Sequence, residues 1–445
     1  MNKNIVILGG GESGVGAALL AQQKGYTVFV SDFNLIKDKY KEELNKYNIP
    51  FEEKQHTTEK ILQANIVIKS PGIPNKAPII QQIKANNIPI VSEIEFAAQY
   101  TNATIIAITG SNGKTTTTAL IYHILSKAEF DVALAGNIGD SFAKKVWERD
   151  YQYFVLEISS FQLDDIQHFK PHIAIISNIT EDHLDRYNYD VQNYIDAKFN
   201  ITKNQTNSDY LIYNIDDPYT INNLNKYNIQ SKLIPFSYYK QLEEGGFVNN
   251  NELIIQLNKN NFSMSLNELS IQGIHNTYNS LAAGISAKIL DVRNEKTRES
   301  FQDFKNMDHR LEYVISVRHI DFINDSKATN VNSTWFALES MTKPTVLLLG
   351  GVDKGNDYTL IKDLVKEKVK AIICIGEDNE TLHQAFSDVV GYIVDSKDME
   401  DAVKLAYNIA DKGDVVLLSP CCASFDRFDN YEDRGNQFKK FVRSL

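Results

Sequence analysis

The sequence predicts an α/β protein of three domains, each built on a mainly parallel β-sheet. Short apolar, β-branched runs alternate with helix-type segments along the whole chain, which is typical of βαβ units. Two glycine-containing turns, at residues 9–14 and 110–113, each join such a run to a helix-type segment. A chain of 445 residues is also too long for one ordinary hydrophobic core. We place the domains at residues 1–96, 97–295 and 296–445.

Composition narrows the class of protein. A hydrophobic content of 43% is that of a globular protein, and a formal net charge of -11 argues against non-specific nucleic-acid binding. Three cysteines cannot make a disulfide framework and fit a reducing compartment. The apolar run at the N-terminus stops in glycines, and no apolar stretch reaches the ~18–20 residues that span a bilayer. We therefore expect a cytoplasmic protein with neither a membrane segment nor a nucleic-acid partner.

The first domain carries a glycine pattern between its first strand and first helix. Its strand-type and helix-type segments are 4–9, 14–25, 27–32 and 64–74. The turn reads Gly9-x-Gly11-x-x-Gly14, and Asp32 ends the second strand. This dinucleotide-binding pattern, in its strand–turn–helix context, predicts a Rossmann-like sheet with a diphosphate at the helix N-terminus. The alternative is a glycine-rich turn that serves only helix–strand packing.

The second domain begins with ATIIAITGSNGKTTTTA, residues 103–119. A strand, a glycine turn and a helix in this order gather backbone N–H groups around one point, which favours a phosphate. Gly110 and Gly113 would let the backbone approach, Lys114 would reach the outer phosphates, and the Thr115 hydroxyl would bind magnesium. The general P-loop has a further glycine earlier in the loop, so this is a shorter variant. ATP or GTP binding is predicted; the alternative is an ordinary turn with a solvated lysine.

Charged side chains follow two strands of this P-loop domain. Glu157 lies in the run 153–159, and Asp182, His183 and Asp185 follow the run 172–180. Ligand sites in open α/β sheets lie outside the carboxyl ends of the strands, so we expect a magnesium ligand there. Further strand-type runs are 130–136, 209–216 and 232–237. Residues 240–262 predict an exposed β-hairpin, and 272–290 predict a helix that places Asn276 and Asn279 on one face.

The third domain is again Rossmann-like. Its strand-containing segments are 319–325, 345–355, 370–377, 392–396 and 414–426. Most of them end in Gly, Ser or charged turns, and they alternate with helix-type stretches, as in a doubly wound parallel sheet. The adjacent Cys421 and Cys422 have no second Cys or His cluster near them in sequence, so we interpret the pair as loop packing.

The order of the motifs resembles the Mur ligase family. They are TGSNGKTT, LEISSFQL, NITEDHLDRY, HN-x-x-N, HR, NDSKATN, GGVDKG and LSPCCASFD. The resemblance covers all three domains, and NDSKATN with SP-x-CASFD resembles the D-glutamate-adding branch. It implies an ATP-dependent ligase that joins D-glutamate to UDP-N-acetylmuramoyl-L-alanine in cytoplasmic peptidoglycan synthesis. The substrate carboxylate would take the ATP γ-phosphate to give an acyl phosphate, which the D-glutamate amine attacks. All substrates would be small molecules, and we expect a monomer.

The resemblance also implies roles for single residues. ATP binding would involve Gly110, Ser111, Asn112, Gly113, Lys114, Thr115, Thr116, Asn276, Asn279, Arg310, Asp325 and Lys327. Two magnesium ions would be bound by Thr115, Glu157, His183 and Lys198. Lys198 aligns with a lysine that is carbamylated in this family, and Lys114, His183 and Lys198 would be catalytic.

Two further residue sets follow from the resemblance. D-glutamate would be bound through its two carboxylates by Thr329, Lys354, Ser424 and Tyr431. The uridine diphosphate substrate would contact Ser13, Asp32, Gly72, Asn137 and His183. Phe33 and Asn34 stand where some relatives carry Thr-Arg, so Phe33 is expected to stack or pack against the uracil.

Three other functions compete with this interpretation. Another carboxylate–amine ligase of the same superfamily, such as a different Mur step or folylpolyglutamate synthase, would share the phosphate loop and differ in the third domain. A P-loop regulatory protein would hydrolyse ATP without ligating anything. An NAD-dependent oxidoreductase is suggested only by the glycines of residues 9–14.

Overall fold

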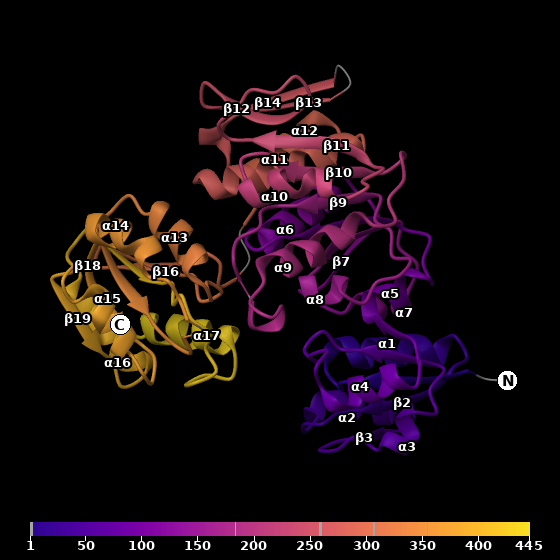
Figure 1. The fold of residues 1–445 in the computed structure, drawn as a ribbon. Coiled ribbons are helices and arrows are strands. Elements are labelled where there is room, and N and C mark those ends of the chain that lie inside the picture. The colour runs from indigo at the N-terminus through magenta and orange to yellow at the C-terminus, as the bar shows by residue number, and fades with distance from the viewer. Residues whose placement is uncertain (1–2, 183, 258–259, 306–307, 354) are drawn as a thin grey trace. The chain divides into compact units, whose positions relative to one another are not determined.

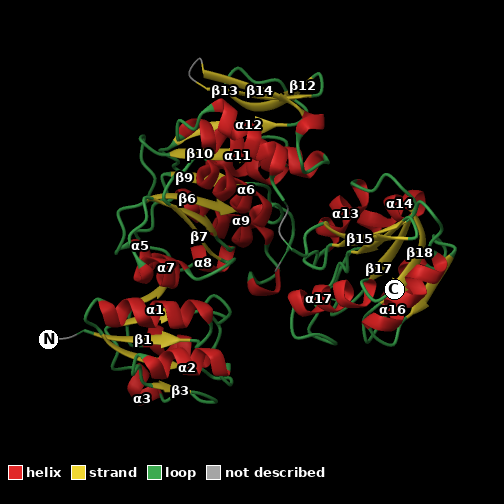
Figure 2. Cartoon of the chain, turned by 180° about the vertical axis from the view of Figure 1, so that it is seen from behind, coloured by secondary structure: helices red, strands yellow, loops and turns green. Residues whose placement is uncertain are grey.

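The structure is a computed structural model that describes residues 3–182, 184–257, 260–305, 308–353 and 355–445. The chain divides into two compact units. The first contains residues 1–270 and 277–304, and the second contains residues 271–276 and 305–445. Figure 1 follows the chain through three separate β-sheets, and Figure 2 shows the same strands and helices from behind. No helix in the described part of the chain is both long and apolar enough to cross a membrane.

The N-terminal sheet has five parallel strands in the order β3-β2-β1-β4-β5. Its elements are β1 (Asn4–Leu8), α1 (Glu12–Gln23), β2 (Thr27–Ser31), α2 (Asp38–Lys46), β3 (Phe51–Glu52), α3 (Thr58–Ile61), β4 (Ile66–Lys69), α4 (Pro78–Ala85), β5 (Ile90–Ser92) and α5 (Glu93–Ala98). The order reverses beside β1, so the carboxyl ends of β1, β2 and β4 flank a topological switch point, where such sheets bind ligands.

The glycine turn after β1 has two local requirements. Gly9 has a φ of 98°, a left-handed conformation that favours glycine. A Cβ on Gly14 would lie 1.9 Å from the carbonyl oxygen of Gly9, so a side chain there would push α1 away from β1. The predicted strand–turn–helix is confirmed, and Gly14 serves close helix–strand packing.

The middle sheet has nine strands in the order β14-β13-β12-β11-β10-β9-β6-β8-β7. Its elements are β6 (Thr104–Thr109), α6 (Lys114–Lys127), β7 (Val132–Gly136), α7 (Phe142–Glu148), β8 (Tyr153–Glu157), α8 (Ser160–Leu163), β9 (Ile173–Ile176), η1 (Leu184–Arg186), α9 (Val191–Phe199), η2 (Asn200–Thr202), β10 (Tyr210–Asn214), α10 (Pro218–Asn223), η3 (Leu224–Lys226), β11 (Lys232–Ser237), β12 (Gly245–Asn249), β13 (Glu252–Leu257), β14 (Asn260–Ser265), η4 (Leu266–Glu268), α11 (Ile274–Ile289) and α12 (Asn294–Asp303). The strands from β7 to β12 are parallel, and β13 and β14 are antiparallel to their neighbours.

The prediction of an exposed β-hairpin at residues 240–262 was wrong. Strands β12, β13 and β14 extend the middle sheet through β11 and are not a solvated excursion. Leu253, Ile255 and Phe262 are buried, and the Phe262 ring lies 6.0 Å from Phe301 of α12. The apolar residues that alternate with polar ones in β13 thus lie on one face, which helices cover, as expected for a half-buried strand.

One hydrophobic core runs through the N-terminal sheet and the middle sheet. Helices α1 and α5 pack against α7, and buried side chains of all three belong to the same cluster. The contact is close: a Cβ on Gly16 of α1 would lie 2.0 Å from Ser141 Oγ, at the N-cap of α7. Residue 96 therefore lies in a buried helix that belongs to this shared core.

The C-terminal sheet has six strands in the order β15-β16-β20-β17-β18-β19. Its elements are β15 (Glu312–Val317), β16 (Ile320–Asn324), α13 (Val331–Glu339), β17 (Thr345–Leu349), α14 (Thr359–Lys368), β18 (Val369–Cys374), α15 (Glu380–Phe386), β19 (Tyr392–Asp395), α16 (Met399–Ile409), β20 (Val415–Leu418) and α17 (Tyr431–Val442). All pairs are parallel except β15 with β16. Sequence reasoning missed β15, a short strand whose side chains are all exposed or half-buried.

Candidate active site

The phosphate loop connects β6 to α6, as predicted. Gly110 has a φ of 149° and Gly113 a φ of 82°. A Cβ on Gly110 would lie 2.0 Å from Ser177 Oγ, and one on Gly113 would lie 2.4 Å from Asn279 Oδ1. Both glycines are therefore required by backbone conformation and by close neighbours. The helix N-terminus that follows presents its first N–H groups to the loop, as a phosphate requires.

Two lysines converge on one carbonyl group of this loop. Lys114 Nζ donates to the Gly110 carbonyl at 2.8 Å and to the Ser111 carbonyl at 2.8 Å. Lys198 Nζ, from α9, donates to the same Gly110 carbonyl at 2.7 Å. Residues 84 positions apart (198 minus 114) thus share one acceptor, and the sequence motifs alone did not show this juxtaposition.

The Lys198 amine is buried, with 1% of the residue exposed. Burial, followed by the neighbouring Lys114 charge, holds the pKa of Lys198 well below its usual range, while Asp182 and Asp164 act in the opposite direction. The Tyr194 ring lies 4.4 Å from Nζ. A lysine in such surroundings favours its neutral amine, which is the nucleophilic form.

Glu157 ends β8 beside the phosphate loop. Its Oε2 accepts a hydrogen bond from Thr115 Oγ1 at 2.7 Å, and its Oε1 accepts one from Asn137 Nδ2 at 2.8 Å. Residue Glu157 is 1% exposed. The predicted carboxylate and hydroxyl therefore lie in contact, and oxygen ligands of this kind are those that magnesium prefers.

Hydrogen bonds to the loop after β9 hold the phosphate loop in place. Ser111 Oγ donates to the Thr180 carbonyl at 2.9 Å and lies 3.1 Å from the Tyr194 hydroxyl. The backbone N–H of Asn112 donates to Asn178 Oδ1 at 2.9 Å. On the other side, Thr117 Oγ1 donates to Asn279 Oδ1 at 3.0 Å, while Thr116 is buried in α6.

A cavity of about 820 Å³ opens at the carboxyl edge of the N-terminal sheet. Ser13, Asp32 and Gly72 all line it, together with Phe33 and His56. The Asp32 carboxylate accepts from the backbone N–H of Gly10 at 2.7 Å, which fixes the glycine turn. The Phe33 ring is 69% exposed and lies 5.8 Å from the His56 ring. Asn137 does not line this cavity and contacts Glu157 instead.

In the second unit, Asp325 and Arg310 lie near one another. Asp325 is buried and accepts from the Leu311 N–H at 3.2 Å and from Ser419 Oγ at 3.0 Å. Burial raises the pKa of Asp325 to about 6, against the pull of Arg310 and the two hydrogen bonds. Burial, aided by Arg310, lowers the pKa of His275 to about 4. Asn276, on the first turn of α11, donates to the Gln272 carbonyl at 2.8 Å.

The buried guanidinium of Arg434 joins two of the loops predicted to bind D-glutamate, those that contain Thr329 and Ser424. Its Nε donates to Ser326 Oγ at 3.0 Å, and its terminal nitrogens donate to the carbonyls of Ser326 at 2.8 Å and Cys422 at 3.1 Å. Ser326 Oγ in turn donates to the Tyr431 carbonyl at 2.8 Å. Ser424 is buried two residues beyond Cys422.

Other predicted residues are placed as follows. Thr329 is exposed, and Lys327 Nζ lies 5.4 Å from the Tyr431 ring centre. His183 and Lys354 lie outside the described residues. All three cysteines are free and buried.

Sequence reasoning missed several buried polar residues around these sites. Arg434 lies on α17 with no motif around it, and Glu95 accepts hydrogen bonds from the backbone N–H groups of Gln167, His168 and Phe169. Lys69 pairs with Asp165 at 2.9 Å. The only available signal was a charge inside an otherwise apolar stretch, as in IPIVSEIEFAA.

Comparison with known proteins identifies the family to which this chain belongs. The chain matches the Mur ligase MurD-like N-terminal domain at residues 3–92, the Mur ligase middle domain at 108–287 and the Mur ligase glutamate ligase domain at 309–422. The chain belongs to the Mur ligase family, and its fold is the three-domain α/β fold predicted from the sequence.

Individual relatives are similar over their whole length. A UDP-N-acetylmuramoylalanine–D-glutamate ligase of Bacteroides thetaiotaomicron is 56% identical, and one of Christiangramia forsetii is 52% identical; each match covers 100% of both chains. Among solved structures, UDP-N-acetylmuramate-alanine ligase MurC of Thermotoga maritima is 16% identical with a TM-score of 0.65, covering 100% of both chains. A pseudomurein peptide ligase type C of Methanothermus fervidus is 21% identical with a TM-score of 0.61, covering 100% of this chain and 99% of the other.

Proposed function

We propose that this chain is an ATP-dependent ligase that joins D-glutamate to UDP-N-acetylmuramoyl-L-alanine. The observation that carries the proposal is the identity of 52–56% over the full length with two ligases named for that product. The reaction would be a cytoplasmic step of peptidoglycan synthesis, performed by a monomer on small-molecule substrates. Residues 1–96 would bind the uridine diphosphate substrate, residues 97–295 would bind ATP, and residues 296–445 would bind D-glutamate.

The phosphate loop would bind the triphosphate of ATP. Its backbone N–H groups from Ser111 to Lys114 would bind the β- and γ-phosphates, with Lys114 as the cation. Thr116, Asn276, Asn279, Arg310, Asp325 and Lys327 complete the proposed nucleotide contacts. Lys114 now donates to two loop carbonyls, so nucleotide binding would exchange these acceptors for phosphate oxygens. ATP use is supported by membership of the family.

Magnesium fits the oxygen donors beside this loop. Thr115 Oγ1 and the Glu157 carboxylate lie 2.7 Å apart and are buried, and Lys198 as a carbamate would add a further carboxylate. His183 is proposed for the second ion. When bound, magnesium would neutralise charge on the phosphoryl oxygens.

Carbamylation of Lys198 is supported by its surroundings. A neutral lysine amine attacks carbon dioxide, a C–N bond forms and one proton is released, which leaves an anionic carbamate. The low pKa of Lys198 supplies the neutral amine, and Lys114 offers a cation to the product.

The protein's own contribution to catalysis is position and charge. The substrate carboxylate is a poor electrophile until it carries the γ-phosphate as a leaving group. Lys114, at the start of α6, would stabilise negative charge on the transferred phosphoryl group, and the rigid loop would align it with the carboxylate. The amine of D-glutamate would then attack the acyl phosphate, and the tetrahedral intermediate would collapse to amide and phosphate.

Recognition of D-glutamate is proposed for the two loops that Arg434 joins, together with Lys354. Thr329 and Lys354 would bind one carboxylate, and Ser424 with the Tyr431 backbone would bind the other. For the uridine substrate, Ser13, Asp32 and Gly72 would contact the diphosphate end, Phe33 the uracil, and Asn137 and His183 the sugar–alanine part.

An acceptor panel tests the reaction. ADP release is measured with UDP-N-acetylmuramoyl-L-alanine, ATP and one of D-glutamate, meso-diaminopimelate, L-lysine or L-alanine. D-glutamate should be preferred by orders of magnitude, and release should require the uridine nucleotide and the amino acid together. Equal rates with all four acceptors would contradict the D-glutamate assignment, and release without either substrate would indicate an ATPase.

A lysine series tests the carbamate. Lys198→Ala should lose activity, and bicarbonate or short-chain carboxylic acids should restore part of it because they can replace the missing carboxylate. Lys439→Ala is the control, because Lys439 is a buried lysine that pairs with Glu312 in the second unit. Its remaining activity should not respond to added acids. A fully active Lys198→Ala protein would refute the ligand role.

A further inference from the structure

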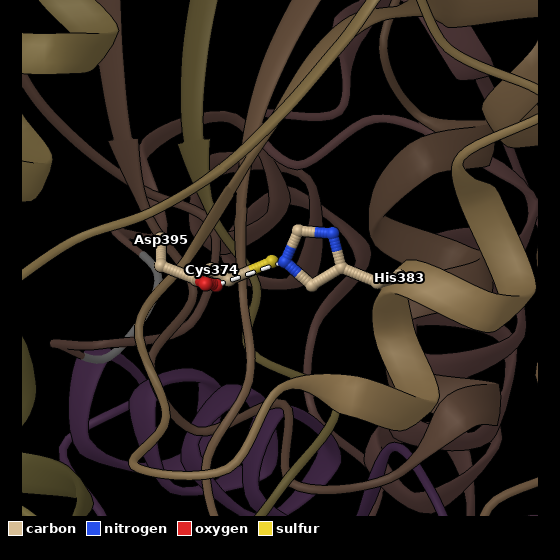
Figure 3. A group of neighbouring side chains, drawn as sticks. All are labelled: Cys374, His383 and Asp395. Carbon is tan, nitrogen blue, oxygen red and sulfur yellow. Dashed lines mark hydrogen bonds and ion pairs between the residues drawn. The ribbon is translucent and has the colours of Figure 1, made fainter.

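A cluster of three side chains lies at one edge of the C-terminal sheet, apart from the residues proposed for the ligase reaction. Strands β18 and β19 are parallel neighbours, and Cys374 lies directly opposite Asp395 in their register. Residues opposite one another in a sheet project their side chains to the same face. Helix α15, which connects the two strands, supplies His383. Figure 3 shows the thiol, imidazole and carboxylate converging on one point.

The distances between the three groups suit a common ligand. His383 Nε2 lies 3.0 Å from Asp395 Oδ1, and the sulfur, nitrogen and oxygen atoms all lie within 4.8 Å of one another. Metal bonds of about 2.0–2.3 Å in a tetrahedral zinc site place such ligand atoms roughly 3.3–3.6 Å apart. Side-chain movements of the order of 1 Å would therefore bring the three ligand atoms to the spacing of a zinc site.

A neighbouring side chain orients the carboxylate. Asn379 Nδ2 donates to Asp395 Oδ1 at 3.0 Å and to the Gly376 carbonyl at 3.0 Å. Outer-shell hydrogen bonds of this kind hold the carboxylate ligands of metal sites. Cys374 is fully buried, whereas the side chains of His383 and Asp395 are 36% and 58% exposed, so the cluster is closed on the sulfur side and open on the other.

The open side faces a cavity of about 480 Å³ that contains more acidic than basic groups. Glu377, Asp378 and Glu380 line it beside His383 and Asp395, and Arg427 is the opposing charge. Arg427 donates to the backbone carbonyls of Ser396 and Lys397, the two residues that follow Asp395. A cavity of this size would give an ion access and leave room for a bound water.

The donor set selects the class of metal. Thiolate sulfur and imidazole nitrogen favour borderline-soft transition ions, whereas magnesium and calcium prefer oxygen ligands alone. A thiol that coordinates a cation gives up its proton, so the sulfur of Cys374 would bind the ion as a thiolate.

A catalytic triad is the other interpretation of Cys, His and Asp. In a triad the imidazole accepts from the nucleophile with one nitrogen and donates to the acid with the other. Here the His383 nitrogen that faces the cluster is bonded to Asp395, and the thiol is fully buried. The sulfur is therefore neither activated by the imidazole nor accessible to a substrate.

We propose that Cys374, His383 and Asp395 bind one Zn²⁺, or a divalent transition ion of similar softness, with water in the fourth position. The bound ion would join the ends of β18, α15 and β19. Three protein ligands and one open position are also the arrangement of zinc sites that exchange a ligand.

Cobalt binding tests the proposal. The full-length protein is freed of metal with a chelator, exchanged into excess Mg²⁺ to fill oxygen-ligand sites, and titrated with Co²⁺. One equivalent should produce a sulfur-to-cobalt charge-transfer absorption, which Zn²⁺ should abolish by displacement. Metal analysis after gel filtration should then find one zinc per chain.

Variants locate the ion. Cys374→Ser should remove the absorption, and His383→Ala and Asp395→Asn should each weaken binding by more than the roughly tenfold cost of losing an outer-shell partner. His123→Ala is the matched control, because His123 Nε2 lies 2.8 Å from Asp303 Oδ1 in a His–carboxylate pair with no cysteine nearby in sequence. It should bind like the wild type.

Several results would overturn the site. The wild-type protein could show no absorption, or Cys374→Ser could keep it, which would place the metal at Cys421 or Cys422. If Cys374→Ser does not fold, His383→Ala and Asp395→Asn test the site instead. Unchanged cobalt affinity in both variants would exclude the cluster.

Discussion

The Glu93→Gln substitution should be more favourable for stability at pH 8 than at pH 5. The quantity compared is the free energy of unfolding of the variant minus that of the wild type. Glu93 begins α5, is 2% exposed and lies where α5 packs against α7. One carboxylate oxygen accepts from the Ala143 N–H, and the other has no hydrogen-bond partner among the described residues. Burial raises the pKa of Glu93 to about 7, opposed by the Ala143 hydrogen bond.

The sign follows from the direction of this shift. The folded pKa of about 7 lies above the ordinary glutamate value of 4.5, so the folded state disfavours the charged form. The loss of stability from ionising Glu93 is absent below pH 4.5, grows between pH 4.5 and 7, and is complete above pH 7. At about 1.4 kcal/mol per pKa unit, ionised Glu93 costs the fold about 3 kcal/mol at pH 8 and about 1 kcal/mol at pH 5. Gln carries no charge at either pH, so the difference between the two proteins should change by roughly 2 kcal/mol.

Denaturant unfolding at both pH values measures this change. Trp147 on α7 lies 5.4 Å from Tyr47, so its fluorescence reports on the contact between α7 and the first domain. A Trp335→Phe background removes the second of the two tryptophans. Glu95→Gln is the opposite control, because that carboxylate accepts three backbone N–H bonds and its loss should destabilise the protein. A stability difference between Glu93→Gln and wild type that is the same at pH 5 and pH 8 would refute the reasoning.

Three further substitutions have expected outcomes. Arg434→Met should lower the free energy of unfolding by roughly 2–4 kcal/mol, because it leaves buried carbonyl groups without a donor; a guanidinium chloride titration measures this, and a loss below 1 kcal/mol would contradict it. Lys114→Ala should abolish ADP formation and leave the Kd for the uridine substrate unchanged by calorimetry, since Lys114 is proposed to bind the ATP phosphates and does not line the cavity of the N-terminal sheet. Phe33→Ala should raise that Kd about tenfold through lost stacking on the base, with kcat preserved, and an unchanged Kd would exclude Phe33 from uracil binding.

The sequence was sufficient to predict the structure wherever residues close together in the chain determine the conformation. The turn at Gly110–Gly113 combines a strand, two glycines, a lysine and a helix within a few residues, so its conformation could be predicted before its surroundings were known. The contact between Thr115 and Glu157 followed from a general rule, because strand ends of a parallel sheet meet at one edge.

Long-range pairing explains what the sequence could not show. Arg434 meets Ser326 across 108 positions, and Glu95 meets Phe169 across 74. Cys374 lies opposite Asp395 only through the register of two strands. No periodicity within a window of 10–20 residues records such contacts, since each depends on how whole elements pack.

The shared core of α1, α5 and α7 has a practical consequence for dissecting this protein. A fragment that ends near residue 96 would leave the small-residue face of α1, around Gly16, open to water where Ser141 now covers it. Such a fragment would expose apolar surface and tend to self-associate. The first two domains are therefore best expressed together, and studies of uridine nucleotide binding should retain the middle sheet.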